Sequence, residues 1–271
     1  MLGRVLVPCL ERRGHEVHGL DIDQLDITQY KSVLRAVEER QPELVLHGAA
    51  YTAVDQAESD AATAFRVNAY GTENLAVACS RIKVPMLYIS TDYVFDGQAT
   101  RPYQPLDQTR PMSVYGKSKL AGEIAVRNHL REFYIVRTSW LYGPHGKNFV
   151  ETILQLAKER KQLKVVADQT GSPTSTATLS DCISDLIATG RLGTYHATDG
   201  GVTTWCDFAR EITKNLEVEV IPCETKDFPR PAPRPQYSVL DKSSLIDTIG
   251  RDVVPWQEAL DNYINQRLQP A

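Results

Sequence analysis

The stretch Pro85-Met86-Leu87-Tyr88-Ile89-Ser90 is a nearly unbroken apolar run that ends at Thr91. A helical pattern follows over residues 114–128, and Phe133 to Arg137 is a second short run beyond it. Continuous apolar strands are typical of a parallel sheet that is covered on both faces. Strand, helix and strand in this order predict a βαβ unit, and place the loop after residue 90 at the sheet edge where ligands bind.

The same alternation extends toward the N-terminus. Residues 2–10 show helical spacing of apolar side chains, and Gly14 stands where a C-terminal cap belongs. We expect, in order, a strand over Glu16 to Leu20, a helix capped by Thr28 and running to about Arg40, a strand over Leu44 to Leu46, and a helix from about Asp60 to Arg81. The predicted fold class is α/β, a Rossmann-type doubly wound parallel sheet.

The pattern loosens after Gly143, where prolines at 173, 222 and between 228 and 235 interrupt it. Helices are still expected near 148–160, 179–189 and 204–215. We therefore predict an NAD(P)-binding domain over residues 1–143 and a smaller substrate-binding domain over 144–271. Within the second, residues 163–197 should return in part to the main sheet, through Lys164 to Val166 and Thr194 to His196.

Composition excludes several classes of protein. The 271 residues carry a net charge of −4, which argues against a nucleic-acid partner held by phosphate contacts. No apolar run approaches the roughly 20 residues that span a bilayer, so no membrane partner is expected. The five cysteines are widely spaced and form no C-x-x-C pair, which indicates reduced thiols in a cytoplasmic protein. The six histidines form no metal signature, and no metal site is expected.

The residues that point to chemistry are Tyr115 and Lys119, four apart on a predicted helix and thus on one face. A nearby ammonium favours phenolate, so Lys119 should lower the pKa of Tyr115 and make it a usable acid near neutral pH. Such a pair alone is a weak signal. Thr91 strengthens it, because a hydroxyl at the tip of the preceding strand faces the same crevice and can donate to a substrate carbonyl.

Longer strings carry a family resemblance. Ser90-Thr91-Asp92-Tyr93-Val94-Phe95-Asp96-Gly97 and Tyr115-Gly116-Lys117-Ser118-Lys119-Leu120-Ala121-Gly122-Glu123 resemble the dTDP-4-dehydrorhamnose reductases, which are extended short-chain dehydrogenases/reductases. The likeness continues through residues 49–55, 67–72, 137–140, 146–149, 168–174, 234–235 and 238–241. It implies hydride transfer from NADPH or NADH to a dTDP-4-keto-6-deoxy sugar, in dTDP-rhamnose biosynthesis for surface polysaccharide. The resemblance is also compatible with a homodimeric assembly.

The resemblance implies roles for matched positions. Tyr115 would protonate the C4 oxygen, Thr91 would bind it, and Lys119 would tune Tyr115 and hold the nicotinamide ribose. Further implied cofactor contacts are Asp26, Ile27, Ala49, Ala50 and Tyr51, and implied substrate contacts are Val54, Asp55, Asp92 and Trp140. Arg234 fits the nucleotide diphosphate, because guanidinium binds phosphate oxygens in pairs. Three of these residues have alternative interpretations: Trp140 can be a core aromatic, Asp55 can cap a helix, and Arg234 can be a solvated cation.

The start of the chain departs from the family. Of the G-x-x-G-x-x-G turn that cradles the pyrophosphate, only the last glycine is matched, by Gly3. Asp21 and Asp23 lie near the spacing of about 20 residues at which an acid binds the adenosine ribose. We therefore expect a sheet lacking its first strand through N-terminal truncation. That predicts weak NAD(P)H binding, and an empty lane between Glu16–Leu20 and Pro85–Ser90 or a rearrangement that closes it.

Alternatives remain at this point. Sugar-nucleotide dehydratases share the tyrosine and lysine but carry Thr-Asp-Glu, whereas Tyr93 follows Asp92 here, which favours simple reduction. A talose-forming 4-ketoreductase and a non-catalytic regulatory relative stay open. The choice between NADH and NADPH is open too. Asp21 and Asp23 disfavour the 2′-phosphate of NADPH, while Arg12 or Arg13 can offset their negative charge.

Overall fold

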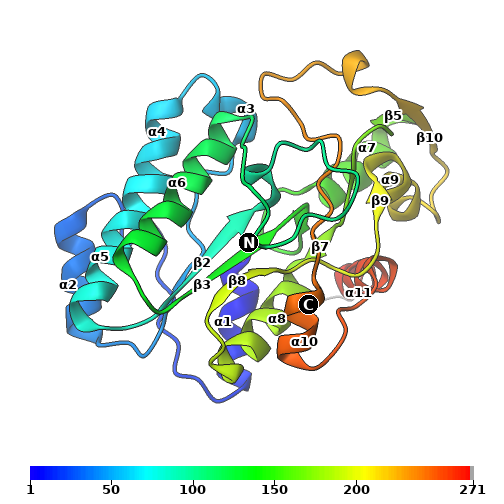
Figure 1. Ribbon diagram of the computed structural model, residues 1–271. Coiled ribbons are helices and arrows are strands. Elements are labelled where there is room, and N and C mark those ends of the chain that lie inside the picture. The colour runs from blue at the N-terminus through cyan, green and yellow to red at the C-terminus, as the bar shows by residue number, and fades with distance from the viewer. Residues whose placement is uncertain (269–271) are drawn as a thin grey trace.

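The computed structural model describes residues 1–268 and shows a four-stranded parallel sheet in the order β1-β2-β3-β8 (Figure 1). The strands are β1 (Val45–His47), β2 (Met86–Thr91), β3 (Phe133–Thr138) and β8 (Gly193–His196). Ser90 is the register partner of Arg137, and Thr91 is that of Thr138. The α/β class with a parallel sheet is thus confirmed.

Helices cover both faces of this sheet (Figure 1). One layer holds α2 (Tyr30–Arg40), α4 (Ala61–Phe65), a π-helical segment η1 (Arg66–Gly71), α5 (Thr72–Ile82) and α6 (Val114–His129). The other holds α1 (Gly3–Arg12), α8 (Thr176–Thr189) and α10 (Ser243–Ile249). Side chains of β2 alternate between them: Met86 and Tyr88 enter the first core, and Leu87 the second. This explains the unbroken apolar run in the sequence.

The remaining elements form a smaller layered region with its own core around Phe208 and Leu260. Its helices are α7 (Phe149–Glu159), α9 (Trp205–Ile212) and α11 (Trp256–Leu268), and its parallel strand pair is β5 (Gln162–Val166) with β10 (Glu219–Cys223). Short elements link it to the sheet: α3 (Val54–Ala57), η2 (Asp92–Val94), β4 (Leu141–Tyr142), β6 (Thr170–Gly171), β7 (Thr174–Ser175), β9 (Thr203–Thr204) and η3 (Thr225–Asp227). The predicted domain boundary at residue 143 stays a prediction, and residues 269–271 of the second domain lie outside the described residues.

Several expected elements are wrong. Residues 16–20 are not a strand, because no described strand offers them a hydrogen-bonding partner. Of the two outcomes expected beside Pro85–Ser90, the empty lane is wrong and the closed sheet is found, since β1 pairs directly with β2 from Val45 opposite Met86. Lys164 to Val166 do not join the main sheet but pair with β10. By contrast, Thr194 to His196 do pair with β3.

Two helix predictions also need correction. The helix expected over 60–81 is divided by η1 into α4 and α5. Thr28 does not cap α2, which begins at Tyr30 after Gln29, because the Thr28 hydroxyl donates to Asp26 at 2.8 Å instead.

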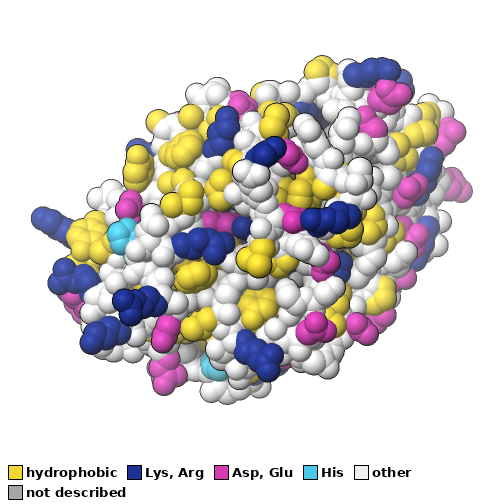
Figure 2. All heavy atoms as spheres, viewed as in Figure 1, with side chains coloured by type: hydrophobic (Ala, Val, Ile, Leu, Met, Phe, Trp, Pro, Cys, Tyr) yellow, Lys and Arg dark blue, Asp and Glu magenta, His cyan; other side chains and the backbone are white. Residues whose placement is uncertain are grey.

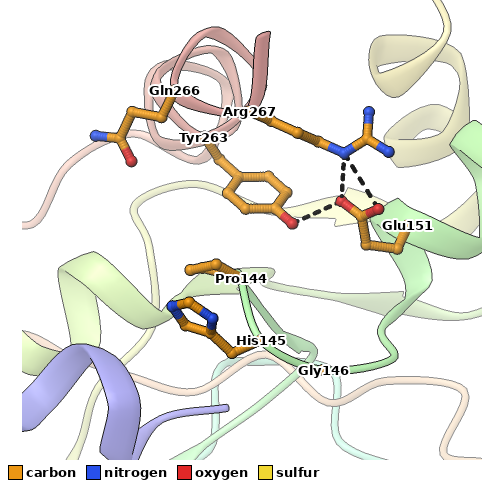
Figure 3. A pocket seen from close by; sticks show the side chains of 8 residues that line it. Pro144, His145, Gly146, Glu151, Tyr263, Gln266 and Arg267 are labelled. Carbon is orange, nitrogen blue, oxygen red and sulfur yellow. Dashed lines mark hydrogen bonds and ion pairs between the residues drawn. The ribbon is translucent and has the colours of Figure 1, made fainter. Parts of the chain in front are cut away.

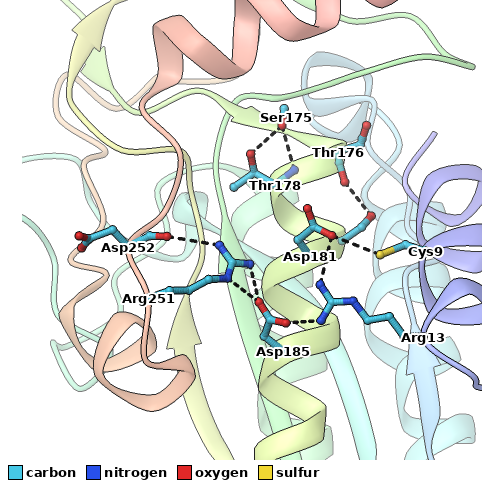
Figure 4. Close-up of polar contacts among 10 residues, drawn as sticks. Cys9, Arg13, Ser175, Thr176, Thr178, Asp181, Asp185, Arg251 and Asp252 are labelled. Atoms are coloured by element: carbon cyan, nitrogen blue, oxygen red, sulfur yellow. Dashed lines mark hydrogen bonds and ion pairs between the residues drawn. The ribbon is translucent and has the colours of Figure 1, made fainter.

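Helix α1 lies on α8 through an apolar seam and a polar margin (Figure 4). Leu6 and Leu10 are buried in the core shared with α8. At the margin the Arg13 guanidinium bonds Asp185, and Arg251 near α10 contacts the same carboxylate at 2.5 Å. Gly14 ends α1 with φ +87°, and the His15 N–H reaches back to the Leu10 carbonyl at 3.2 Å, which is the expected glycine cap.

The surface carries mixed charge. Figure 2 shows basic and acidic side chains interspersed on one face without a large field of either sign. Over residues 1–268, no helix combines the length and apolar character required to cross a bilayer. The five cysteines are free thiols, four of them buried.

Candidate active site

The catalytic candidates come together where β2 ends and α6 begins. Thr91 is the last residue of β2, and Tyr115 and Lys119 lie one turn apart on α6. The helix starts because the Ser113 hydroxyl accepts from the Gly116 N–H at 3.1 Å. The helix can lie close to β2 and to the Tyr93 backbone because Gly116 and Gly122 have no Cβ. A Cβ at Gly116 would collide with the Tyr93 carbonyl, and one at Gly122 would lie 2.5 Å from the Tyr88 hydroxyl. Two glycines thus let the helix bring both side chains to the strand tip.

Lys119 is 2% exposed and fixed from two sides. Its Nζ donates to the Ile89 carbonyl at 2.7 Å and lies 4.1 Å from the Tyr88 ring centroid. Burial lowers the pKa of Lys119 to about 7, and the negative charge of Glu123 opposes that change. The side chain is therefore poised between ammonium and amine near neutral pH.

The pKa of Tyr115 differs from the one that the sequence predicted. Burial raises its pKa to about 12, the Thr91 hydroxyl opposes this through a hydrogen bond, and the Asp92 charge adds to it. The predicted lowering of this pKa is thus wrong for this structure, because desolvation of the phenol dominates and the Lys119 ammonium is turned to the Ile89 carbonyl. Tyr93 packs edge-on against the Tyr115 ring at 5.5 Å and shields it. Tyr115 is therefore a protonated hydroxyl, the form that a proton donor needs.

Asp92 follows Thr91 and is buried with it. Its Oδ1 accepts from the Thr91 hydroxyl at 3.0 Å, and its Oδ2 has no hydrogen-bond partner. Burial raises the pKa of Asp92 to about 6, against the opposing hydrogen bond from Thr91. An unpartnered carboxylate oxygen in a buried site is suited to receiving a hydroxyl from a ligand.

Asp55 and Arg234, both expected at the substrate, bond each other. Arg234 Nη2 lies 2.8 Å from Asp55 Oδ1, and Arg230 lies 3.9 Å from the same carboxylate. Arg234 is therefore neither solvated nor an unpaired cation, and Asp55 is not a helix cap. The pair lies beside a hollow of about 330 Å³ between Tyr93 and the chain at 233–236. Arg234 faces this hollow with part of its charge already neutralised.

Trp140 is held at an unusual backbone angle, φ +48°. Its ring stacks on Trp205 with centroids 3.6 Å apart, and a Cβ at Gly171 would lie 2.6 Å from it. The indole is half-buried and packs at the margin of the core around Phe208, and its contact with the substrate stays a prediction. Val54 begins α3, next to Asp55, and is half-buried.

The cofactor candidates divide into two groups. Tyr51 follows β1 and is clamped by Asn68, whose side chain accepts from the Tyr51 N–H at 2.8 Å and donates to its carbonyl at 3.0 Å. The Tyr51 hydroxyl is a buried oxygen without a partner. Ala49 and Ala50 lie beside it in the same loop. This group lies on the α6 side of the sheet, because Asn68 also donates to Ser118 at 2.9 Å.

The second group is dispersed. Gly3 opens α1 with free space around it, and Asp21 lies in an exposed turn. Asp26 accepts from Thr28, and Ile27 packs on Gly71, so both have local partners. Arg13 is bonded to Asp185 and faces α8, so it does not offset Asp21 as considered from the sequence. The structure does not bring these residues together with Lys119 through any described contact.

Sequence reasoning gave no role to Asn68, although the string containing it was noted. Its amide links the Tyr51 backbone to Ser118 from within a π-helical turn, a backbone form often found at functional sites. It also missed Glu123 and Arg137, a buried pair behind the catalytic residues. The sequence signal for the Glu123–Arg137 pair was a carboxylate and a guanidinium that stand within apolar patterns. Two such charged groups require each other when they are buried.

A further hollow of about 400 Å³ lies between the loop at 143–146 and α11 (Figure 3). Its wall includes Glu151, which accepts from the Tyr263 hydroxyl at 2.7 Å and pairs with Arg267 at 2.9 Å. None of the predicted site residues lines it. In the part of the chain that the structure describes, no cluster of three or more His, Cys, Asp or Glu could hold a metal.

Comparison with known proteins decides the family. The model of the RmlD substrate-binding domain matches residues 1–269. The chain belongs to this RmlD family. A dTDP-4-dehydrorhamnose reductase of Streptomyces griseus is 46% identical over 252 residues, which are 90% of this chain and 83% of that protein. The Bacillus subtilis spore coat polysaccharide biosynthesis protein SpsK is 38% identical, over 98% of this chain and 94% of that protein.

Solved structures of dTDP-4-dehydrorhamnose reductases superpose closely on this chain. That of a dTDP-4-dehydrorhamnose reductase from Clostridium acetobutylicum has a TM-score of 0.96 at 42% identity, covering 99% of this chain and 96% of that one. A dTDP-4-dehydrorhamnose reductase from Bacillus anthracis, in complex with NADP, has a TM-score of 0.94 at 40% identity, covering 98% and 95%. The expected Rossmann-type fold is therefore confirmed.

Proposed function

We propose that this chain reduces dTDP-4-dehydro-L-rhamnose to dTDP-L-rhamnose with NADPH or NADH as the hydride source. The observation that carries the proposal is the meeting of Thr91, Tyr115 and Lys119 at the tip of β2, in a chain of the RmlD family. Relatives at 38–46% identity are named as reductases of this substrate, which supports the same assignment here. The proposal places the chain in dTDP-rhamnose biosynthesis.

The residues present fit the nicotinamide end of such a cofactor. The buried Tyr51 hydroxyl lacks a partner and Lys119 is a buried cation, and a ribose carries the hydroxyls that both can bind. When bound, the cofactor supplies a hydride. Lys119, Tyr51 and the loop through Ala49 and Ala50 would hold it, and Asp21 or Asp26 with Gly3 would serve the adenosine end.

The reaction requires one proton beside the hydride. The C4 carbonyl gains a hydride at carbon, and Tyr115 gives its phenolic proton to the oxygen, leaving phenolate. To stabilise that phenolate, the Lys119 ammonium would have to turn from the Ile89 carbonyl, which it contacts at 2.7 Å. Thr91 would turn its hydroxyl, which in this structure donates to Asp92 Oδ1 at 3.0 Å, toward the same oxygen. The pKa of about 12 suits Tyr115 as a donor, since it stays protonated until negative charge develops on the substrate oxygen.

Among the expected sugar and nucleotide contacts, Arg234 lines the hollow beside Tyr93 and would bind the diphosphate there. As the family resemblance implies, Asp92 and Trp140 would bind the deoxysugar, with Val54 and Asp55 near it, and the unpartnered Asp92 Oδ2 supports this. Because Arg234 is paired with Asp55, phosphate must share or displace that partner. The domain division at residue 143 and a homodimeric assembly belong to this proposal as well.

The test is NADPH oxidation followed by absorbance, with dTDP-4-dehydrorhamnose as substrate and with NADH in parallel. Nuclear magnetic resonance of the product distinguishes rhamnose from talose, which a 4-ketoreductase attacking the other face would form. A protein that melts cooperatively and binds NADPH in calorimetry, yet oxidises none of it, would favour the non-catalytic regulatory alternative.

A further inference from the structure

A buried charge cluster lies directly behind the catalytic residues. Glu123 is 1% exposed and Arg137 is 2% exposed. Two parallel hydrogen bonds join them, Nε to Oε1 at 2.8 Å and Nη2 to Oε2 at 2.7 Å. The Ser90 hydroxyl donates to Oε1 at 2.6 Å. Such a pair is tolerated in a dry interior only when its hydrogen bonds are satisfied, as they are here.

The cluster connects separate elements. Glu123 is on α6, Ser90 on β2 and Arg137 on β3, and the last two are register partners. Arg137 Nη1 also donates to the Pro105 carbonyl at 3.0 Å and meets His196 Nε2 of β8 at 3.4 Å. One guanidinium thus links α6 with the Pro105 carbonyl and with His196 of β8.

The position of the cluster relates it to the reaction. Glu123 follows Lys119 by four residues, and therefore shares its face of α6. Lys119 bonds the Ile89 carbonyl, and Glu123 bonds the neighbouring Ser90 side chain. The next residue of β2 is Thr91. Two contacts at consecutive residues of β2 therefore fix the position of α6 along this strand, next to Thr91.

The charges around Lys119 come from several elements. Glu123 on α6 favours its ammonium, while His47 on β1, whose pKa burial and Lys119 lower to about 3, is neutral. Tyr88 on β2 presents its ring, and its pKa is raised far above the usual value by burial. Further off, Tyr115 is protonated and Asp92 on η2 acts on Tyr115. Beyond Glu123 lie Arg137, neutral His196, and Arg127 of α6, whose Nη2 is 3.5 Å from Glu123 Oε2. Glu123 is therefore the anion that acts on Lys119.

We propose that Glu123, held by Arg137 and Ser90, is a positioning residue that sets Lys119 and Tyr115 against Thr91 and stabilises the ammonium form of Lys119. This rests on the proposed function, since it names a further residue for the same reaction. Arg137 keeps the Glu123 carboxylate ionised: hydrogen bonds from Arg137 and Ser90 outweigh burial, and lower its pKa.

The first test is Glu123→Gln, which keeps the shape and the acceptor for Ser90 but removes the charge. We expect kcat to fall by about tenfold at neutral pH, with KM for the sugar nucleotide within about threefold. The basic limb of the kcat profile should move to lower pH by about one unit, because Lys119 then loses its proton more readily. An unmoved limb would overturn the proposal.

A second variant separates charge from folding. Glu123→Leu with Arg137→Met replaces the pair by apolar side chains, a change that often preserves stability. It should melt cooperatively and still show the displaced limb. Full kcat and an unmoved limb would show that the pair acts on stability only. Asp185→Asn, which removes surface ion pairs to Arg13 and Arg251, is the matched control and should leave the profile unchanged.

A third measurement needs no substrate. The titration of the Lys119 Nζ is followed by nuclear magnetic resonance of ¹⁵N-lysine-labelled protein, with Lys119→Arg to assign the signal. The midpoint should fall in Glu123→Gln and not in Asp185→Asn. An equal midpoint in parent and Glu123→Gln overturns the inference. A displaced midpoint in a protein without reductase activity would support it while contradicting the proposed function.

Discussion

Residues 86–138 and residues 13–29 both contain runs that the sequence pattern predicts as strands, but the two regions differ in how they are held. In the first region β2 has strands on both sides and helices on both faces, and Met86, Leu87 and Tyr88 are fully buried. In the second region, Leu20 is 40% exposed and Ile22 70% exposed. An apolar alternation becomes a strand only where another strand offers hydrogen bonds and another layer offers burial.

The comparison also explains where the site lies. Every reacting group proposed above is on an element of the first region, fixed by contacts that leave little freedom. The acids expected at the adenosine end lie in the second region, where Asp21 is exposed and Asp26 bonds its sequence neighbour Thr28. Catalytic groups require a rigid support, and only the first region provides it.

The largest effect is expected from the first region. Tyr115→Phe removes the proton donor while leaving the ring against Tyr93, so kcat should fall by roughly 10²–10⁴. NADPH affinity in calorimetry should stay within a few-fold of the parent. Turnover within threefold of the parent would remove Tyr115 from the mechanism.

Matched leucines compare the two regions directly. Leu87→Ala opens a cavity beneath β2 and should lower the free energy of unfolding by about 2–5 kcal/mol. Leu20→Ala should change it by less than about 0.5 kcal/mol, because the side chain is exposed. Urea titrations of both variants measure the difference. Equal costs would mean that residues 16–20 are packed as firmly as the sheet.

Two buried histidines of the sheet should make stability depend on pH. Burial lowers the pKa of His47 and of His196 to about 3, against 6.5 when unfolded. The unfolded chain therefore binds more protons between these values, and stability falls as pH decreases through 6.5 toward 3. Each histidine should cost about 2 kcal/mol at pH 5 relative to pH 7.5. Unfolding at both pH values in His47→Gln should show a smaller loss, whereas exposed His18→Gln should match the parent.

The smallest effect is expected at the end of α1. Gly14 has φ +87°, where a Cβ is disfavoured although nothing lies within 4 Å of it. Gly14→Ala should therefore cost about 1–2 kcal/mol through backbone strain alone. Glu11→Ala, in the same turn, is the control. Thermal melts that show no loss for Gly14→Ala would mean that the turn after α1 rearranges without cost.

The spacing of nearby residues was sufficient to predict part of this structure. The run at 85–90 determined a strand buried on both faces, the interval from Tyr115 to Lys119 determined a shared helical face, and Gly14 determined a helix end. Each depends on residues within a few positions of one another, where backbone geometry alone relates them. The family strings likewise predicted the fold and the reductase activity.

Tertiary structure decided the rest. Asp55 and Arg234 lie 2.8 Å apart though far separated in sequence, which turned two independent candidates into one pair. The pKa of Tyr115 depended on burial, which no interval in the chain encodes, so its direction was predicted wrongly. Residues 16–20 had the pattern of a strand but no partner. Hydrogen-bond partners, charge neighbours and dehydration are supplied by distant segments, and exist only once the chain has folded.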